Sequence, residues 1–176
     1  HPAQQAMLAM FTELAGEPID IVGVDGCTLP APRLSLIGFA RALAKIAAPD
    51  LLKGTMSKSA EQIMASTMQF PFLTGGSKSP NSIMTAASSK KFFAKNGAEG
   101  VYAVILPEAR AAMVLKIADG SMRAADVAIA GMLSQMAEYL NLDKDMLNKF
   151  TTEDMYNSAN TKVGVCRYTN IMPIQN

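Results

Sequence analysis

The sequence predicts an α+β fold in which an antiparallel sheet is flanked by helices. Apolar residues recur at helical spacing over the first half of the chain, up to about residue 87. They then fall into short runs typical of strands, before helical spacing returns beyond residue 120. Helices followed by a group of strands indicate an α+β protein, whereas a regular alternation of the two would indicate a parallel α/β sheet.

Capping and helix-breaking residues set the bounds of the expected helices. Pro2 suits a first helical turn because its missing N–H is not needed there, and Gly16 followed by Pro18 ends the pattern. Pro49 and Pro71 end the next two helical stretches, because the residue before a proline avoids helical geometry. The expected helices are 2–15, 34–47, from Ser57 or Ser59 to about 69, 83–87, 121–140 and 143–150.

Strands are expected where short apolar runs end at turn residues. Asp25-Gly26 marks a turn after the first such run. Pro30-Ala31-Pro32 predicts a stiff extended loop, because proline prevents a helix there. Pro107-Glu108-Ala109-Arg110 joins two later runs as a hairpin. The expected strands are 19–24, 92–94, 101–106, 112–117 and 163–168.

The composition is that of a globular protein with nearly balanced charge. Of the 176 residues, 49% are hydrophobic, and 16 Lys and Arg stand against 15 Asp and Glu. This balance argues against a nucleic acid or an anionic membrane as a partner. The two cysteines, Cys27 and Cys166, are too few for a disulfide framework and favour a reducing, cytoplasmic compartment. No apolar stretch is long enough to span a bilayer. The length of the chain and the lack of an internal boundary predict one domain over residues 1–176.

A lysine followed by a glycine bend is the first candidate for chemistry. Lys95-Asn96-Gly97 ends one expected strand and precedes the next, which places the lysine at the edge of the sheet. Serine acyl-transfer enzymes have a Lys-Thr-Gly at such an edge. The lysine there adds positive charge beside the nucleophile, and the glycine leaves room for the substrate. An ordinary surface lysine before a turn is the alternative explanation of these three residues.

Two longer segments resemble the type II asparaginases of bacteria. One is Lys95-Asn96-Gly97-Ala98-Glu99-Gly100-Val101-Tyr102, and the other is Val22-Gly23-Val24-Asp25-Gly26-Cys27, which precedes a proline-containing loop and an apolar helix. Both occur in the order and at the spacing of the family. From residue 1 to about 133, the chain is similar to the C-terminal half of a Rhizobium-type asparaginase of the serine β-lactamase-like class.

The resemblance implies a fold of the β-lactamase/glutaminase type and an amidohydrolase that converts L-asparagine to L-aspartate and ammonia. A serine activated by a lysine would attack the side-chain amide and form an acyl-enzyme that water resolves. Lys95 would be catalytic, and Cys27 would bind a zinc ion together with other cysteine and lysine side chains. Asp25 and Gly26 would bind the substrate, because a carboxylate is the natural partner of its ammonium group. A homodimer is implied as well.

The chain also departs from the family pattern. Asn96 replaces the usual threonine, and Lys78 stands in a loop where the family more often has arginine. The Ser-x-x-Lys nucleophile segment and the Cys-Ser-Gly-Lys-His zinc segment of the family are expected upstream of residue 1. Residues 1–176 would then be the C-terminal part of a longer asparaginase domain. Ser88-Ser89-Lys90-Lys91 fits Ser-x-x-Lys literally but is interpreted as a solvated loop, as is Ser79-Pro80-Asn81, which imitates a Ser-x-Asn motif.

Three functions therefore stay open on the sequence alone. The first is asparagine hydrolysis, with part of the site supplied from outside this chain. The second is a non-catalytic β-lactamase-like module that binds amino acids or peptides, which Asn96 and the missing nucleophile would permit. The third is a helical interaction fragment, since the chain contains 13 methionines at largely helical spacings. The sequence does not separate asparagine from glutamine as the substrate.

Overall fold

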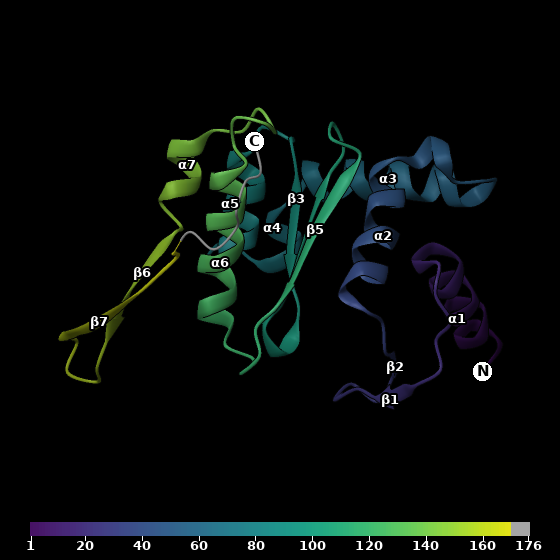
Figure 1. Cartoon of the computed structure of the whole chain (residues 1–176), viewed down its shortest axis with the longest axis horizontal. Coiled ribbons are helices and arrows are strands. Elements are labelled where there is room, and N and C mark those ends of the chain that lie inside the picture. The colour runs from purple at the N-terminus through teal and green to yellow at the C-terminus, as the bar shows by residue number, and fades with distance from the viewer. Residues whose placement is uncertain (170–176) are drawn as a thin grey trace. The chain divides into compact units, whose positions relative to one another are not determined.

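The computed structural model describes residues 1–169, and the chain divides into two compact units. Unit 1 comprises His1–Met64 and Ile105–Val114, and unit 2 comprises Ala65–Val104 and the chain from Leu115 onward. The position of the units relative to one another is not determined, so each is described by itself (Figure 1). Strands β4 (Val101–Leu106) and β5 (Ala111–Lys116) run through both units. The single domain over residues 1–176 therefore stays a prediction.

The order of helices and strands confirms the predicted α+β class. The α-helices are α1 (Pro2–Ala15), α2 (Leu36–Ala47), α3 (Thr55–Gln69), α4 (Phe72–Gly75), α5 (Pro80–Ala87), α6 (Met122–Gln135) and α7 (Lys144–Asn148). Short 3₁₀ turns are η1 (Pro49–Leu51) and η2 (Ala98–Gly100). Besides β4 and β5, the strands are β1 (Val22–Val24), β2 (Pro30–Pro32), β3 (Phe93–Asn96), β6 (Thr152–Tyr156) and β7 (Lys162–Arg167). No helix within residues 1–169 has the length and apolar character needed to cross a bilayer.

Helices α1 and α2 pack against each other in unit 1. Helix α1 ends as predicted at Gly16, whose φ of 67° is left-handed and whose N–H donates to Thr12 O at 3.0 Å. Leu14, Ala15 and Ala42 form the buried contact between the two helices. Arg41 Nη1 donates to the carbonyl of Ala15 at 2.7 Å, so the side chain of α2 also satisfies the last turn of α1.

The segment Pro30–Pro32 is a strand and not the unpaired loop that its prolines predict. It pairs antiparallel with β1, with Val22 opposite Pro32 and Val24 opposite Pro30. The flanking hydrogen bonds, from Asp25 N to Leu29 O and from Arg33 N to Ile21 O, are both 2.9 Å. Hydrogen-bonded and non-hydrogen-bonded pairs alternate along an antiparallel ladder. Both prolines therefore fall at non-hydrogen-bonded positions, where no N–H toward β1 is needed.

Unit 2 is built around helices α5 and α6, which pack against β3 (Figure 1). The sheet order is β3-β4-β5, and the predicted hairpin between β4 and β5 is present. The core residues with no exposed surface are contributed by helices and strands alike. They include Met84, Phe92, Tyr102, Ile129 and Leu133. Within β3, Ala94 is fully buried against this core, whereas the next residue, Lys95, is exposed.

Several elements differ from the sequence-based expectation, and two helix bounds and one strand illustrate the reasons. Helix α3 begins at Thr55, so that Ser57 and Ser59 lie inside it and do not cap it. Helix α6 ends at Gln135, five residues earlier than expected, and turns follow it. Strand β6 was not expected, because Thr152–Tyr156 is polar and mostly exposed and lacks the apolar alternation of a half-buried strand.

The turn between β3 and β4 uses two successive left-handed residues. Glu99 has φ 58° and Gly100 has φ 70°. The carbonyl of Gly100 accepts from Ile117 N at 2.9 Å, which ties the turn to the end of β5. A Cβ at Gly100 would lie 2.9 Å from Ile117 Cβ and 3.0 Å from the carbonyl carbon of Gly120. Glycine is therefore required here both for its backbone conformation and for the close approach of Ile117.

The first testable prediction concerns this turn. Gly100→Ala is expected to lower the free energy of unfolding by about 1–3 kcal/mol, because it adds backbone strain and a clash with Ile117. Urea unfolding followed by circular dichroism measures the change. Gly26→Ala is the control, because no described atom lies within 4 Å of a Cβ at that position. Equal midpoints for the two variants would contradict the prediction.

Candidate active-site residues

Asp25, Gly26 and Cys27 lie together in the loop that joins β1 to β2. The N–H of Thr28 donates to Asp25 O at 2.8 Å, which closes a four-residue turn, and Thr28 is left-handed at φ 69°. The Cys27 N–H donates to Asp25 Oδ2 at 3.2 Å. The loop is exposed, so the carboxylate and the thiol are both open to solvent. The turn thus presents a negatively charged oxygen next to a sulfur atom.

The turn keeps Asp25 ionised. The Cys27 side chain, followed by the backbone N–H groups of Cys27 and Gly26, holds the pKa of Asp25 below its usual range. These donors bind the charged form of the carboxylate and therefore favour it. At neutral pH, Asp25 is an anion, as an ordinary exposed aspartate is, and the turn extends the ionised form to lower pH.

Cys27 by itself does not make a zinc site. Structural zinc takes four protein ligands, and catalytic zinc takes three and a water molecule. Within residues 1–169, no three His, Cys, Asp or Glu side chains come close enough to hold a metal ion. A zinc ion at Cys27 would need ligands from outside the described chain, so the zinc site remains a prediction.

Lys95 is an exposed residue of β3 in unit 2. Its Nζ donates to the carbonyl of Asn96 at 2.6 Å and to Asn96 Oδ1 at 3.1 Å. Asn96 therefore offers the ammonium a side-chain acceptor at the position where the family usually has threonine. This geometry supports the predicted place of Lys95 near the end of an edge strand. Asp25, Gly26 and Cys27 belong to unit 1, so the structure brings these three together but gives no distance from them to Lys95.

Helix α5 carries polar side chains that the sequence did not single out as important. Asn81 and Thr85 of α5, and Ser88 directly after its last residue, are buried. Asn81 and Thr85 bind the backbone of Ala94 in β3, and Ser88 binds that of Phe92 just before β3. Thr85 Oγ1 accepts from Ala94 N at 3.0 Å, and Asn81 Nδ2 donates to Ala94 O at 3.4 Å. The spacing i, i+4, i+7 places the three side chains on one helix face. These polar residues on one helix face are the signal in the sequence from which a contact with a neighbouring backbone could have been predicted.

The two serine motifs that imitate a nucleophile segment have structural roles. Ser88 is buried, with its Oγ 2.8 Å from Thr85 O and 3.3 Å from Phe92 O. Lys91 Nζ donates to the carbonyl of Asn141. Ser79 Oγ binds Asn81 Oδ1 at the start of α5. The solvated-loop interpretation thus holds for exposed Ser89 and Lys90, whereas Ser88 and Asn81 are part of the core.

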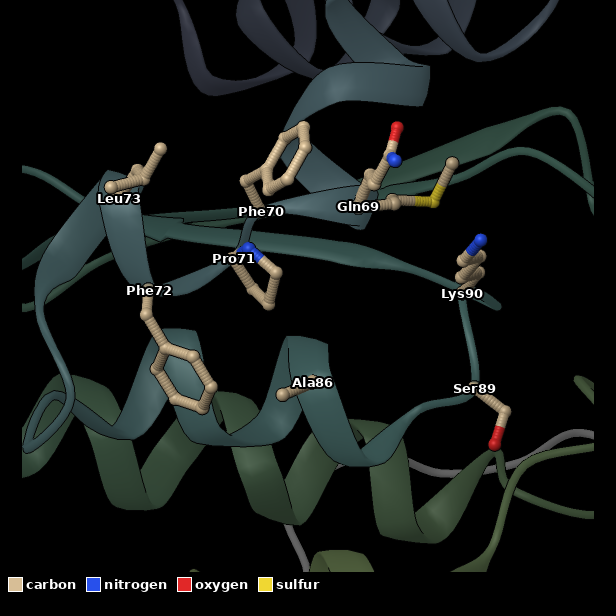
Figure 2. A pocket seen from close by; sticks show the side chains of 9 residues that line it. Gln69, Phe70, Pro71, Phe72, Leu73, Ala86, Ser89 and Lys90 are labelled. Atoms are coloured by element: carbon tan, nitrogen blue, oxygen red, sulfur yellow. The ribbon is translucent and has the colours of Figure 1, made fainter.

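A groove of about 450 Å³ lies in unit 2 between the end of α3, helix α4 and helix α5. Figure 2 shows Phe70 and Phe72 on opposite sides of it, with Ser89 and Lys90 at one end. Its lining is mainly apolar, with Phe70 and Phe72 about half exposed. None of the predicted site residues lines the groove, which contains no pair of acidic and basic groups for catalysis. The groove therefore suits an apolar group and not the expected reaction.

Comparison with known protein families places the chain among the asparaginase-type amidohydrolases. The model of the family described as L-asparaginase II matches residues 1–168, and the chain therefore belongs to the L-asparaginase II family. No curated protein matches the chain in sequence. The family predicted from the two sequence segments is confirmed, whereas the Rhizobium-type subgroup and the C-terminal position within a longer domain remain predictions.

Tyr102, the last residue of the matching segment, lies beside the partly buried carboxyl group of Asp126 on α6. Burial raises the pKa of Asp126 to about 6, the negative charge of Glu153 adds to this, and the Tyr102 side chain opposes it. Burial likewise raises the pKa of Tyr102 above its usual range. The side chains of Tyr102 and Asp126 interact, but the contact lacks the geometry of a hydrogen bond. Within residues 1–169, neither the Tyr102 hydroxyl nor Asp126 Oδ1 has a hydrogen-bond partner of normal geometry. The negative charge of ionised Asp126 is therefore poorly stabilised in the folded chain.

The second prediction is a pH-dependent effect of Asp126→Asn. The carboxyl has a pKa of about 6 in the folded chain and about 4 in the unfolded chain, so the folded state binds the proton more tightly. The stability of the wild type should therefore fall as pH rises from about 4 through about 6. The variant cannot ionise and should be more stable than the wild type by about 1 kcal/mol near pH 8, with no gain near pH 4.

Thermal or urea unfolding at several pH values measures the difference. Glu108→Gln is the control, because Glu108 is an exposed carboxylate in the β4–β5 turn. A wild type that is more stable than Asp126→Asn near pH 8 would contradict the prediction.

Proposed function

We propose that the chain supplies one part of an L-asparaginase active site, which hydrolyses the side-chain amide of L-asparagine to L-aspartate and ammonia. The proposal follows from membership of the L-asparaginase II family. The observation that carries it furthest is the Asp25 turn, in which an exposed carboxylate accepts a hydrogen bond from the Cys27 N–H and lies in the same turn as the Cys27 thiol. An exposed carboxylate that is ionised at neutral pH is a natural partner for the ammonium of an amino-acid substrate.

The reaction in this proposal proceeds through an acyl-enzyme. A serine from a segment outside this chain attacks the amide carbon and loses its hydroxyl proton; the amide nitrogen takes up a proton, the C–N bond breaks and ammonia leaves. Water then attacks the ester and releases aspartate and the free serine. Lys95 supplies positive charge where negative charge develops on the reacting carbonyl oxygen, a kind of stabilisation that contributes much of the rate in such sites. Asn96 supports this role because it accepts two hydrogen bonds from the Lys95 ammonium.

The remaining features of the resemblance belong to the same proposal. Cys27 would bind zinc only with ligands supplied from outside residues 1–169, and no step of the reaction is assigned to the metal. Association as a homodimer and a cytoplasmic location complete the proposal, and the near balance of 16 basic and 15 acidic residues is compatible with both.

The third prediction tests Lys95. In a protein that contains this chain and the serine segment, Lys95→Ala should lower kcat for ammonia release from L-asparagine by about 100-fold or more, because transition-state charge is no longer stabilised. Lys116→Ala is a matched control, since Lys116 is also an exposed lysine at a strand end whose Nζ donates to the next carbonyl at 2.6 Å. Undiminished turnover in the Lys95 variant would remove this residue from catalysis.

The fourth prediction separates binding from catalysis. Asp25→Asn keeps the shape of the side chain but removes the charge, so KM for L-asparagine should rise about 10-fold or more, with a smaller change in kcat. Asp20→Asn serves as the control, because Asp20 lies in the same exposed region but binds Arg33 at 3.0 Å. An equal KM for the wild type and the Asp25 variant would exclude Asp25 from substrate binding. Saturable binding of asparagine by the wild type without ammonia release would favour the non-catalytic binding module.

A further inference from the structure

Both backbone groups of Ala94, the residue before Lys95, are bound by side chains of α5. The Ala94 N–H donates to Thr85 Oγ1 at 3.0 Å, and the Ala94 carbonyl accepts from Asn81 Nδ2 at 3.4 Å. Ala94 and Asn81 have no exposed surface, and Thr85 is 1% exposed. A buried peptide group without such partners is unfavourable. The two side chains thus replace a neighbouring strand at this point of β3.

The alternation of the strand backbone determines the direction in which the N–H and C=O groups of Lys95 and Asn96 point. In a strand, the N–H and C=O groups of successive residues point to opposite sides. Since those of Ala94 face α5, those of Lys95 face β4, and those of Asn96 return to the side of Ala94. The hydrogen bond from Gly97 N to Val101 O, at 2.8 Å, agrees with this alternation. Neither Asn81 nor Thr85 reaches as far as Asn96, whose carbonyl instead accepts from Lys95 Nζ.

We propose that Thr85 and Asn81 are positioning residues for Lys95, and that they set the point at which the edge of β3 becomes accessible to substrate. This inference rests on the proposed role of Lys95. The two hydrogen bonds to Ala94 favour one position of β3 along α5, because a shift of the strand would break both. A slip by one residue would turn the Lys95 side chain to the opposite face of the strand. A catalytic charge has to be held near its productive position by such supporting contacts.

The fifth prediction compares three threonine variants in the asparaginase assay. Thr85→Val keeps the shape of the side chain but removes the acceptor for Ala94 N, and should lower kcat by about 10-fold or more because Lys95 is displaced. Thr85→Ser keeps the acceptor and should restore most of the activity. Thr74→Val is the matched control, since Thr74 Oγ1 donates to Pro71 O at 2.6 Å and makes no contact with Ala94.

A second measurement does not depend on activity. In Thr85→Val, the amide of Ala94 should lose protection from hydrogen exchange and the NMR signal of the Lys95 ε-methylene should shift, while amides in the middle of α6 remain protected. Loss of protection throughout α6 would indicate general destabilisation and would overturn the positioning role. So would a Thr85→Val protein with unchanged kcat and an unchanged Lys95 signal. A wild type that lacks asparaginase activity would refute the proposed function, while the exchange and NMR data would still decide the placement of Lys95.

Discussion

Unit 2 depends on the reversal of the chain at Glu99 and Gly100. Two left-handed residues in succession take the chain from β3 into β4, and the hydrogen bond from Ile117 to Gly100 ties the turn to β5. Once this turn is in place, one side of β3 is paired with β4. The other side is free to meet the polar face of α5. The position of Lys95 thus follows from a backbone constraint and not from contacts of its own side chain with the core.

Asp25 and Lys95, the two charged residues of the proposed function, are each bound by groups close to them in sequence. Asp25 is stabilised by donors of its own turn, and Lys95 is bound by the carbonyl and the side chain of the residue that follows it. Neither group relies on a partner distant in the sequence. Each side chain therefore has its hydrogen-bond partners within its own segment of the chain, although both residues are exposed to solvent.

The sequence predicts those elements whose signals are local. Examples are helix α1, which is bounded by Pro2 and Gly16, and the β4–β5 hairpin. Two short segments of sequence were also enough to identify the family. The Asp25 turn was also predictable, because Asp-Gly marks a bend by itself. The roles of Thr85 and Asn81 were not, because a helical pattern does not tell which strand its polar stripe will face. The pairing of Pro30–Pro32 with β1 was also not predicted. It depends on which residues of the two strands lie opposite each other, and the prolines alone do not indicate this.

The register of β2 has a consequence for the behaviour of the protein in solution. Residues at non-hydrogen-bonded positions direct their backbone groups away from the partner strand. Pro30 and Pro32 occupy these positions, so the outward edge of β2 lacks two of the donors that an incoming strand would need. The hairpin bears exposed apolar side chains, with Val24 82% exposed. The prolines thus protect an exposed, apolar two-stranded ribbon against self-association through edge-to-edge pairing, a common route to aggregation.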